Sequence, residues 1–528
     1  MPSQKRSLKK EDLFFADKPA GCTTHTSLSE SERANPGFDP NDGFKEMLEA
    51  RLGLKLYTVH RLDRETTGAI LFARTADAAE VLREAFASRT VHKKYLFLTD
   101  RKFSSREFIR ESRIEREGSE FVSHQDGAPN SKTQFRLIEE SHGISLWEAR
   151  PETGKSHQIR LHAEDAGIPI LGDREHGGSP FSALCLHSAE LVAGDIRHES
   201  SPPRWFTDRS LVHDRNLSLW LKSIDRRERL VRSWKETTET LRWIHSEGDP
   251  LRAEQLGDVY SLSWFDDELP NTHELASLQR LTEELGWKKW YLQLRGNRGR
   301  SPNEEKTLSA EADIPPRWTA EESGLRFEFR TDTGLSPGLF LDQRQNRKWV
   351  RAHSRGARVL NLFCYTAGFS VAAASGGAEK VVSVDVSKPF LDWSRTNFVL
   401  NALSTDQHEF RFIDSREYLA WAKKKELKFD LIICDPPSFG RSKSGVFKIE
   451  KDFDQLIAML TDVTAPGGTI LFSLNFEVWT EQDLYTRIEK SLAKKPFSIR
   501  RAPSPDWDFE LPREPRNMKS FLISSKKM

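Results

Sequence analysis

An aspartate in a short polar segment is the first candidate for chemistry in this sequence. Residues 59–68 read VHRLDRETTG, and Asp63 is the one aspartate among them. Apolar stretches typical of β-strands flank the segment, at 54–59 and 69–73. Such flanks hold a charged loop stiffly at the edge of a sheet, where functional groups are often placed. Asp63 is therefore a candidate catalytic residue, although a lone loop aspartate is more often a turn former.

Four other short patterns lie in the same third of the chain. A Lys-Pro-Ala-Gly turn begins at Lys18, and a predicted strand at 91–98 contains Tyr95. Residues 153–162 read TGKSHQIRLH, and 167–173 read GIPILGD. Each pattern alone is compatible with solvated surface or ordinary turns. Their fixed order along one stretch of chain is far more specific than any single pattern.

In that order, the five patterns resemble those of the RluA-type pseudouridine synthases. The resemblance covers about residues 13 to 215, with two small departures from the family pattern, Thr67 and Lys155. It implies an α+β domain with a mixed antiparallel sheet that isomerises uridine in RNA without a cofactor. No RNA-binding module is expected before residue 13.

The resemblance also assigns roles to four residues. Asp63 is the catalytic carboxylate, and Arg160 is its ion-pair partner, which keeps it ionised. Tyr95 packs on the base and could accept the C5 proton, and Arg61 fills the gap left by the flipped nucleotide. The alternatives are a surface position for Arg160, a core position for Tyr95 and a phosphate contact for Arg61.

A second group of polar residues follows the predicted strands of the last third. Alternating strands and helices there predict a parallel sheet, and Asp385, Asp414 and Asp435 each follow a strand. Open α/β sheets bind ligands at the carboxyl ends of their strands. A loop that contains Gly368, followed about twenty residues later by an acid, suits a nucleoside cofactor. The loop lacks the G-x-G-x-x-G pattern, so it does not indicate NAD.

This last third resembles class I S-adenosylmethionine-dependent RNA methyltransferases, in particular the bacterial large-subunit rRNA enzymes of the RlmK and RlmI types. The matching segments read GLFLDQR (338–344), NLFCYT (361–366) and DPPSF (435–439). The resemblance covers about 325 to 525 and implies a Rossmann-like fold that binds S-adenosylmethionine. One departure is Ala367, where the family usually has glycine.

The resemblance implies a set of site residues in this domain. Asp435 is assigned to catalysis as well as to the cofactor, and Pro437 and Phe439 to binding of the target base. An ordinary turn is the alternative for Asp-Pro-Pro. The residues expected to bind the cofactor are Arg344, Asn361, Phe363, Tyr365, Thr366, Gly368, Asp385, Asp414, Asp435 and Pro436.

The lack of a cysteine in one predicted strand limits the choice of methyl acceptor. Methylation of cytosine C5 needs a cysteine nucleophile, but the predicted strand at 471–476 reads LFSLNF. Cys434 precedes Asp435 and is expected to point into the core. A covalent C5 mechanism is therefore disfavoured. Because the quoted segments resemble the guanine-N7 type of the family, the resemblance implies guanine N7 as favoured acceptor, with an exocyclic amine of guanine or adenine as second choice.

The middle of the chain predicts a small α+β module, so that the expected domains are 1–215, 216–323 and 324–528. Six tryptophans between 220 and 290 are expected mainly in its core, and stacking on unpaired bases is the alternative. The basic segment 295–300 is compatible with either an RNA contact or an exposed loop, and 301–323 is expected to be a linker.

Bulk composition limits the remaining possibilities. Lys plus Arg is 80 and Asp plus Glu is 79, so any RNA contact must come from local basic patches. The four cysteines are far apart, which indicates neither a zinc site nor a disulfide framework and fits a reducing compartment. No apolar run of about 20 residues and no signal peptide are found. We expect a cytoplasmic protein without membrane partners or metals; the sequence leaves its oligomeric state open.

The prediction is thus an α/β multidomain enzyme with two activities on RNA, and large-subunit rRNA is the favoured partner. One alternative is an RNA-binding ribosome assembly factor with one or both domains inactive. Another is an enzyme that modifies tRNA, since RluA-type enzymes act on both kinds of RNA.

Overall fold

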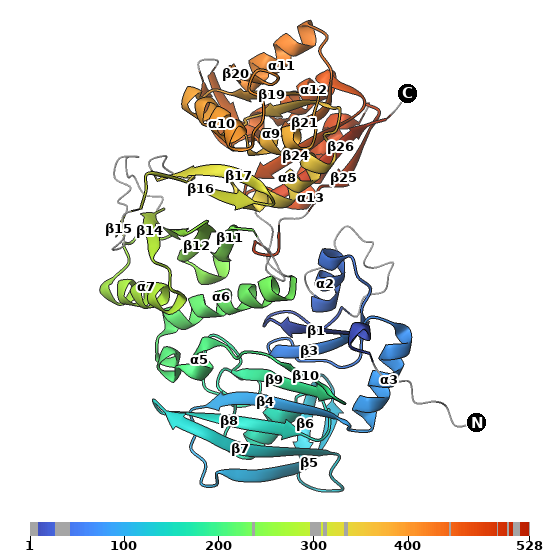
Figure 1. Ribbon diagram of the computed structural model, residues 1–528, viewed down its shortest axis with the longest axis vertical. Coiled ribbons are helices and arrows are strands. Elements are labelled where there is room, and N and C mark those ends of the chain that lie inside the picture. Colours follow the sequence, from blue (N-terminus) through green and yellow to red (C-terminus); the bar gives the residue numbers. More distant parts are fainter. Residues whose placement is uncertain are drawn as a thin grey trace, which may run out of the picture. The chain divides into compact units, whose positions relative to one another are not determined.

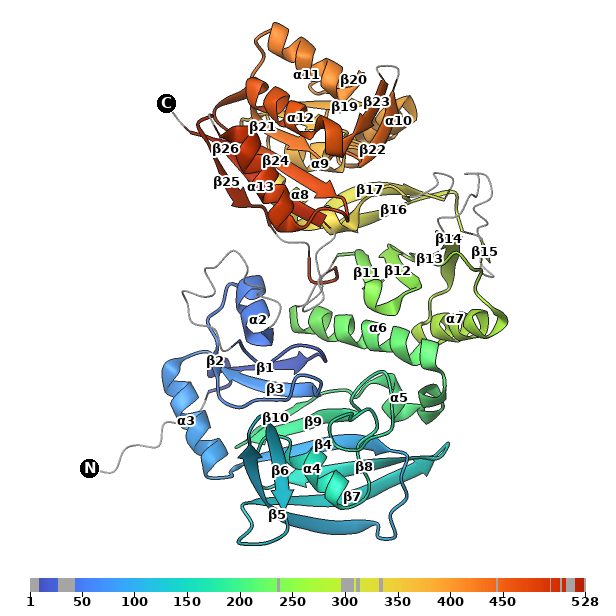
Figure 2. The ribbon, with the colours of Figure 1, turned by 180° about the vertical axis from the view of Figure 1, so that it is seen from behind.

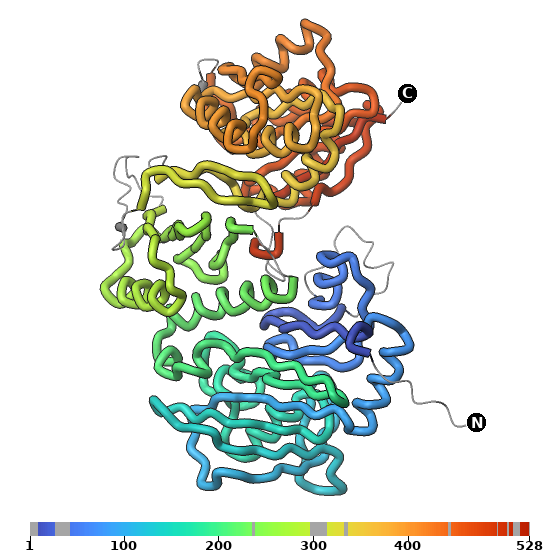
Figure 3. Tube along the Cα trace, in the orientation of Figure 1, coloured from blue at the N-terminus to red at the C-terminus, as the bar shows by residue number. Residues whose placement is uncertain are grey.

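The computed structural model describes residues 9–26, 43–234, 238–295, 308–309, 314–331, 336–442, 445–493, 495–503, 506–509 and 518–526. These form two compact units (Figure 1). The first comprises Met1–Glu236, Trp243–Arg252 and Trp264–Trp287. The second comprises Thr237–Arg242, Ala253–Ser263 and Lys288–Met528. Figure 3 follows the chain through both by colour.

The first third of the chain alternates many strands with few helices. Its elements are η1 (Lys10–Asp12), β1 (Leu13–Lys18), α2 (Phe44–Leu52), β2 (Tyr57–Thr58), β3 (Thr67–Ala73), α3 (Ala76–Ala87), β4 (Val91–Thr99), β5 (Glu107–Glu117), β6 (Glu120–His124), β7 (Ser131–Ser141), β8 (Ile144–Pro151), α4 (Gln158–Asp165), β9 (Leu186–Ala193), β10 (Ile196–Glu199), α5 (Arg204–Thr207), η3 (Arg209–His213) and α6 (Arg215–Trp234).

These strands form one mixed sheet in the order β1-β3-β9-β4-β8-β7-β5-β6, with β10 beside β9 and β2 beside β3. Only the β3–β9 pair is parallel among the pairings described. Strand β3 lies second in this order, between β1 and β9, and is buried along its whole length. The predicted mixed α+β fold is confirmed, and the segment with Asp63 enters the sheet directly through β3.

The middle of the chain forms a five-stranded sheet in the order β11-β12-β13-β14-β15. Its elements are β11 (Thr240–Ile244), η4 (Ser246–Gly248), β12 (Leu251–Leu256), β13 (Val259–Trp264), α7 (Thr272–Leu285), β14 (Lys289–Leu294) and β15 (Leu308–Ser309). The boundary between the two units runs through these residues. The three-domain division therefore stays a prediction.

The tryptophans of this region lie mostly in the interior. Four are buried and two half-buried, which agrees with the core prediction and leaves little ring surface for base stacking. The buried ones are Trp220, Trp234, Trp264 and Trp287.

The prediction that residues 301–323 form a linker is wrong for the last of these residues. Residues Arg317–Glu322 form β16, which pairs with β17 (Leu325–Arg330) in a two-stranded hairpin. The segment alternates as a strand does: Trp318 and Ala320 are buried, and their neighbours are exposed or half-buried. This alternation was not recognised in the sequence. The basic segment predicted at 295–300 lies outside the described residues except for Arg295.

The last third alternates strands and helices. Its elements are η5 (Leu341–Gln343), α8 (Arg344–Ala352), β18 (Arg358–Leu362), α9 (Gly368–Ser375), β19 (Lys380–Asp385), α10 (Lys388–Leu400), β20 (Glu409–Phe412), α11 (Ser415–Lys424), β21 (Phe429–Cys434), β22 (Phe439–Ser442), β23 (Gly445–Lys448), α12 (Ile449–Val463), β24 (Thr464–Asn475), α13 (Glu481–Leu492), β25 (Phe497–Arg501) and β26 (Met518–Ser525).

Seven of these strands form a doubly wound sheet in the order β20-β19-β18-β21-β24-β26-β25. The first five are parallel, and β26 is antiparallel to both of its neighbours. Helices lie on both faces of this sheet (Figures 1 and 2). The strand order reverses direction at β18, so the crevice beyond the ends of β18 and β21 is where such a sheet binds ligands.

Alternate residues of β18 feed two separate cores. Leu360 and Leu362 pack with α11, α12 and α13, whereas Val359 packs with α8 and α9 on the opposite face. This is the pattern of a strand buried on both sides. Among the described residues, no helix is both long and apolar enough to cross a bilayer.

Candidate active sites

Asp63 lies in the loop between β2 and β3, with its side chain 30% exposed. The loop is fastened by Thr24, whose hydroxyl accepts a hydrogen bond from Leu62 N (3.0 Å) and donates to Leu62 O (3.1 Å). His60 Nε2 accepts from Leu71 N (2.9 Å), and burial lowers the pKa of His60 to about 3, so this ring is neutral. The loop thus presents one carboxylate from a rigid backbone.

A buried lysine supports the same loop from the Lys-Pro-Ala-Gly turn. The ammonium of Lys18 donates to the carbonyl oxygens of Pro19 (2.9 Å), Arg64 (2.8 Å) and Thr66 (3.0 Å). Burial lowers the pKa of Lys18. Gly68 follows with φ 110°, and a Cβ there would lie 2.3 Å from Ser188 O, so only glycine fits.

Arg160 lies on α4 and is brought to Asp63 as predicted. Its Nη1 lies 3.7 Å from Asp63 Oδ2, and the guanidinium is 8% exposed. Arg160 also donates to both oxygens of Asp173 (2.7 Å each) and to Glu175 Oε2 (2.7 Å). Burial alone would raise the pKa of Asp173, but the hydrogen bonds from Arg160 lower it. Arg160 is therefore held by two further acids while it faces Asp63.

Tyr95 is buried on β4, where the pairing with β9 shifts register between Lys94 and Tyr95. Such an irregularity re-aims a side chain next to a site. Burial raises the pKa of Tyr95, and the charge of Asp63 raises it further. The phenol therefore stays protonated at neutral pH, which favours the packing role over acceptance of a proton.

These residues line one open cavity of about 760 Å³. Arg61 lies on its rim, exposed, with Nη2 3.3 Å from Ser156 Oγ. An exposed guanidinium that lines the cavity is compatible with both roles considered for Arg61. The predicted residues that line the cavity are Arg61, Asp63, Tyr95 and Arg160.

The second candidate site lies at the carboxyl ends of β18, β19, β20 and β21. The loop after β18 holds three non-glycine residues with left-handed backbones, Phe363 (φ 54°), Tyr365 (φ 51°) and Ala367 (φ 63°). Asp385 fixes this loop, because its carboxylate accepts from Tyr365 N (2.9 Å) and Ser387 N (2.9 Å). Such strained backbone clusters at ligand sites.

The surroundings of Asp385 fit an adenosyl group. Burial raises the pKa of this carboxyl, which is half-buried and keeps acceptor capacity for ribose hydroxyls. Val386 is 48% exposed and Phe412 60% exposed, and Phe412 pairs with Asp385 in the sheet. An apolar surface beside an acid suits a purine ring next to a ribose.

Four of the predicted cofactor residues have other contacts. Asn361 is buried and donates to Ser370 Oγ (2.9 Å), and Thr366 is buried and donates to Gly338 O (2.5 Å). A Cβ on Gly368 would lie 2.7 Å from Leu339, so this glycine serves close packing. Asp414 caps α11 by accepting from Arg416 N (2.8 Å). These four residues therefore support the backbone of the site.

Asp435 follows β21 and accepts a hydrogen bond from Gln343 Nε2 (2.9 Å). Burial, and then the charge of Asp342, raises the pKa of Asp435 to about 7. Pro436 is buried, whereas Pro437 and Phe439 are exposed, Phe439 by 49%. Pro437 and Phe439 are thus accessible to a ligand beside Asp435, and their base-binding role stays a prediction.

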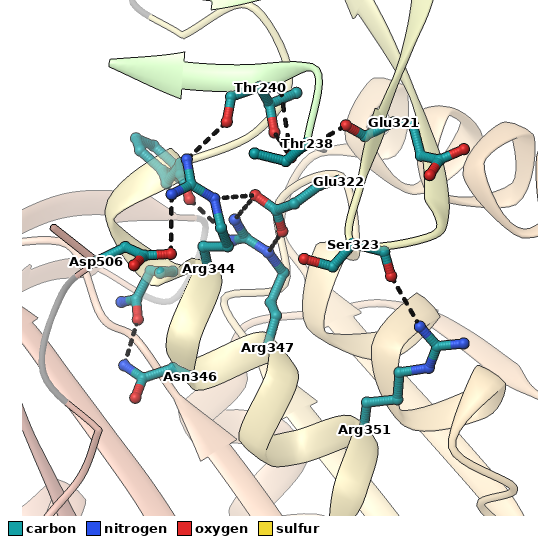
Figure 4. Close-up of polar contacts among 12 residues, drawn as sticks. Thr238, Thr240, Glu321, Glu322, Ser323, Arg344, Asn346, Arg347, Arg351 and Asp506 are labelled. Carbon is teal, nitrogen blue, oxygen red and sulfur yellow. Dashed lines mark hydrogen bonds and ion pairs between the residues drawn. The ribbon is translucent and has the colours of Figure 1, made fainter. Parts of the chain in front are cut away.

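Arg344 is the predicted cofactor residue that the structure places elsewhere. Its fully buried guanidinium donates to Asp506 (3.0 Å) and Asp508 (2.9 and 3.0 Å) and to Thr240 O (2.7 Å) (Figure 4). Arg347, one turn on, pairs with Glu322. We therefore assign Arg344 to joining distant segments and not to binding the cofactor.

The Arg344→Met variant separates these roles. Removing one partner of a buried ion cluster leaves uncompensated carboxylates and costs about 3–5 kcal/mol of stability. We expect a marked fall in the thermal midpoint and unchanged affinity for S-adenosylhomocysteine below that midpoint. Exposed Arg395→Met on α10 is the control. Lost affinity with unchanged stability would contradict this assignment.

Comparisons with known proteins match two regions of the chain. Residues 12–165 match the family model described as RNA pseudouridylate synthase. Residues 244–505 match that of S-adenosylmethionine-dependent methyltransferase. A solved structure titled "a putative methyltransferase complexed with SAH", SMU.776, is 28% identical, with TM-score 0.50, over 58% of this chain and 80% of that one.

Curated relatives are similar over part of the chain. Ribosomal RNA large subunit methyltransferase K of Neisseria meningitidis is 38% identical over 201 residues, 38% of this chain and 55% of the relative. Ribosomal RNA large subunit methyltransferase K/L of Hahella chejuensis is 44% identical over 160 residues, 30% of this chain and 22% of the relative. The chain thus spans about a fifth to about half of these relatives' length.

The fold defines a mixed-sheet domain with a carboxylate in an open cavity, followed by a doubly wound domain with a nucleoside-type site. The chain carries an RNA pseudouridylate synthase domain followed by an S-adenosylmethionine-dependent methyltransferase domain.

Several supporting residues were not predicted from the sequence. Gln343 and Asp342 stand directly before Arg344 in the segment 338–344, but nothing local in the sequence ties them to Asp435. Glu175 and His176 follow the GIPILGD segment and contact the group around Arg160. In the sequence, both pairs could have been suspected from their position next to a matched motif.

Proposed function

We propose that this chain isomerises uridine to pseudouridine at the Asp63 site and methylates a base at the Asp435 site, both in RNA. Large-subunit rRNA is the favoured substrate, and guanine N7 the favoured methyl acceptor. The observation that carries the proposal is the pairing of Asp63 with Arg160 at 3.7 Å in the 760 Å³ cavity, together with the doubly wound site around Asp385 and Asp435.

In the first domain, the residues support a metal-free isomerisation. Asp63 supplies the carboxylate that attacks the ribose or base, and the buried guanidinium of Arg160 pairs with it at 3.7 Å. Tyr95 packs on the uracil ring as a protonated phenol. Arg61 on the rim fills the stack after the nucleotide has left it.

In the second domain, bound S-adenosylmethionine supplies an electrophilic methyl group. Asp385 accepts from the ribose hydroxyls, and Asp435 with Gln343 orients the target base against Phe439. Positioning suffices for a nitrogen acceptor. Cytosine C5 is disfavoured because Cys434 is fully buried and burial raises the pKa of its thiol.

One incubation tests both activities. The purified chain is mixed with unmodified large-subunit rRNA or tRNA and S-adenosylmethionine, and the RNA is digested and quantified by mass spectrometry. We expect pseudouridine and 7-methylguanosine from rRNA. Another methylated nucleoside would overturn the acceptor assignment, and the same products from tRNA alone would overturn the substrate assignment. Neither product from either RNA would favour the assembly-factor alternative.

The pH profile of methyl transfer provides a further prediction. If ionised Asp435 orients the base, the rate rises with pH and its midpoint lies near pH 7. The negative charge of Asp342 raises the pKa of Asp435, so Asp342→Asn shifts the midpoint to lower pH. Exposed Asp392→Asn on α10 serves as control. A profile that Asp342→Asn leaves in place would contradict this role.

A further inference from the structure

Three potential metal ligands gather beside the Asp63 cavity. His157, Glu175 and His176 each offer one ligand atom, and these atoms lie within 4.8 Å of one another. His157 Nδ1 lies 3.0 Å from His176 Nε2 and 3.9 Å from Glu175 Oε2. Ligand atoms that surround one ion at bond lengths of about 2.0–2.2 Å are about 3–4 Å apart. The three atoms already have nearly that spacing.

The orientation of His176 is that of a metal ligand. Its ring is buried, and its Nδ1 lies 3.3 Å from Glu164 Oε2. Donation of the Nδ1 proton to that carboxylate leaves the Nε2 lone pair directed at His157. Metal-binding histidines almost always donate their second ring N–H in this way.

His157 is held in an uncommon backbone conformation. It precedes α4 with φ 56°, in the left-handed region, and this places its ring against His176. Strain of this kind persists where the surroundings impose it, often at ligand sites.

The donor set favours a divalent cation. The ion pairs around the cluster include four carboxylates and the guanidinium of Arg160, and further cationic side chains line the cavity that His157 shares. Imidazole and carboxylate donors together suit Zn²⁺ and similar divalent ions. The four carboxylates are Asp63, Glu164, Asp173 and Glu175.

We propose that His157, Glu175 and His176 bind one divalent transition-metal ion of the Zn²⁺ class. No metal was expected from the sequence. The three ligands come from two segments without a recognisable spacing, so the sequence does not indicate the site. His157 also lines the Asp63 cavity, so a fourth coordination position is open to water there.

Metal binding competes with an existing contact of the first site. Glu175 Oε2 accepts from Arg160 Nη2 at 2.7 Å, and a metal on Glu175 weakens that bond. The ion also adds positive charge near Asp63. We therefore infer that Zn²⁺ inhibits the isomerisation, and this part rests on the proposed function.

Titration of the metal-free full chain with Co²⁺ tests the site without any activity assay. We expect one Co²⁺ per chain with visible ligand-field bands that Zn²⁺ abolishes. His176→Ala removes the bands, and Glu164→Gln weakens binding about 10- to 100-fold. His92→Ala, an exposed histidine on β4, leaves them unchanged. Circular dichroism of the metal-free variants checks that each is folded.

Two outcomes of the titration would overturn the site: no bands in the wild type, or bands that persist in folded His176→Ala. The inhibition is tested separately, as the ratio of isomerisation rates with Zn²⁺ and with chelator. We expect a ratio well below one for the wild type and near one for His176→Ala. Equal ratios would overturn the regulatory effect. If no RNA is isomerised at all, the proposed function fails while the Co²⁺ result stands.

Discussion

Asp63→Asn is expected to lower the rate of pseudouridine formation by about 10⁴-fold or more, the range found when a covalent catalyst is removed. The change keeps the size of the side chain and removes the carboxylate that Arg160 faces at 3.7 Å. The loop keeps its hydrogen bonds with Lys18 and Thr24, because these involve backbone atoms of the loop. Release of tritium from C5-labelled uridine in rRNA measures the rate.

The controls for this prediction lie in the same chain. Asp195→Asn, an exposed residue in the turn after β9, should retain wild-type isomerisation. Methyl transfer by Asp63→Asn should be unchanged, and circular dichroism checks that the first unit of the variant is folded. Substantial isomerisation by Asp63→Ala, which cannot revert by deamidation, would show that another group carries the reaction.

Asp435→Asn is expected to lower methyl transfer by about 100- to 1000-fold, as loss of one preorganised polar group in a site does. Asparagine can still accept from Gln343 Nε2, so the local packing survives. The affinity for S-adenosylhomocysteine should remain within a few-fold of wild type, because Asp385 and the loop after β18 are intact. Transfer of labelled methyl groups to rRNA measures the rate, with Asp392→Asn as control.

The same substitution should also stabilise the second unit at high pH. The pKa of Asp435 is raised from 3.8 to about 7, so ionisation costs stability as pH rises through that window. We expect the free energy of unfolding of Asp435→Asn to be about 2 kcal/mol larger than that of the wild type at pH 8 and equal to it below pH 4. A thermal midpoint below that of wild type at pH 8 would contradict the raised pKa.

The fold was predictable where local patterns agree with the tertiary arrangement. The strand at Arg358–Leu362 is buried from Val359 onward, and of these four buried residues only Asn361 is polar. The hairpin strand at Arg317–Glu322 was missed because it alternates over only six residues, half of them charged. Short strands of that kind carry a weak period, and pairing with a neighbour decides their structure.

The candidate sites were predictable only in part. Asp63 and Asp435 lie within short motifs, and their neighbours in sequence indicate their place. The partners of Arg344, in contrast, are Asp506 and Asp508, more than 160 residues away. Residues brought together from such distances leave no spacing to recognise, and the same holds for Gln343 with Asp435.

The most direct test of the central claim is mass-spectrometric mapping of rRNA and tRNA from cells with and without this gene. We predict loss of one pseudouridine and one 7-methylguanosine from large-subunit rRNA. Complementation with Asp63→Asn should restore only the methylation, and with Asp435→Asn only the pseudouridine. Restoration of both modifications by either variant, or unchanged rRNA in the absence of the gene, would contradict the account of two active sites in one chain.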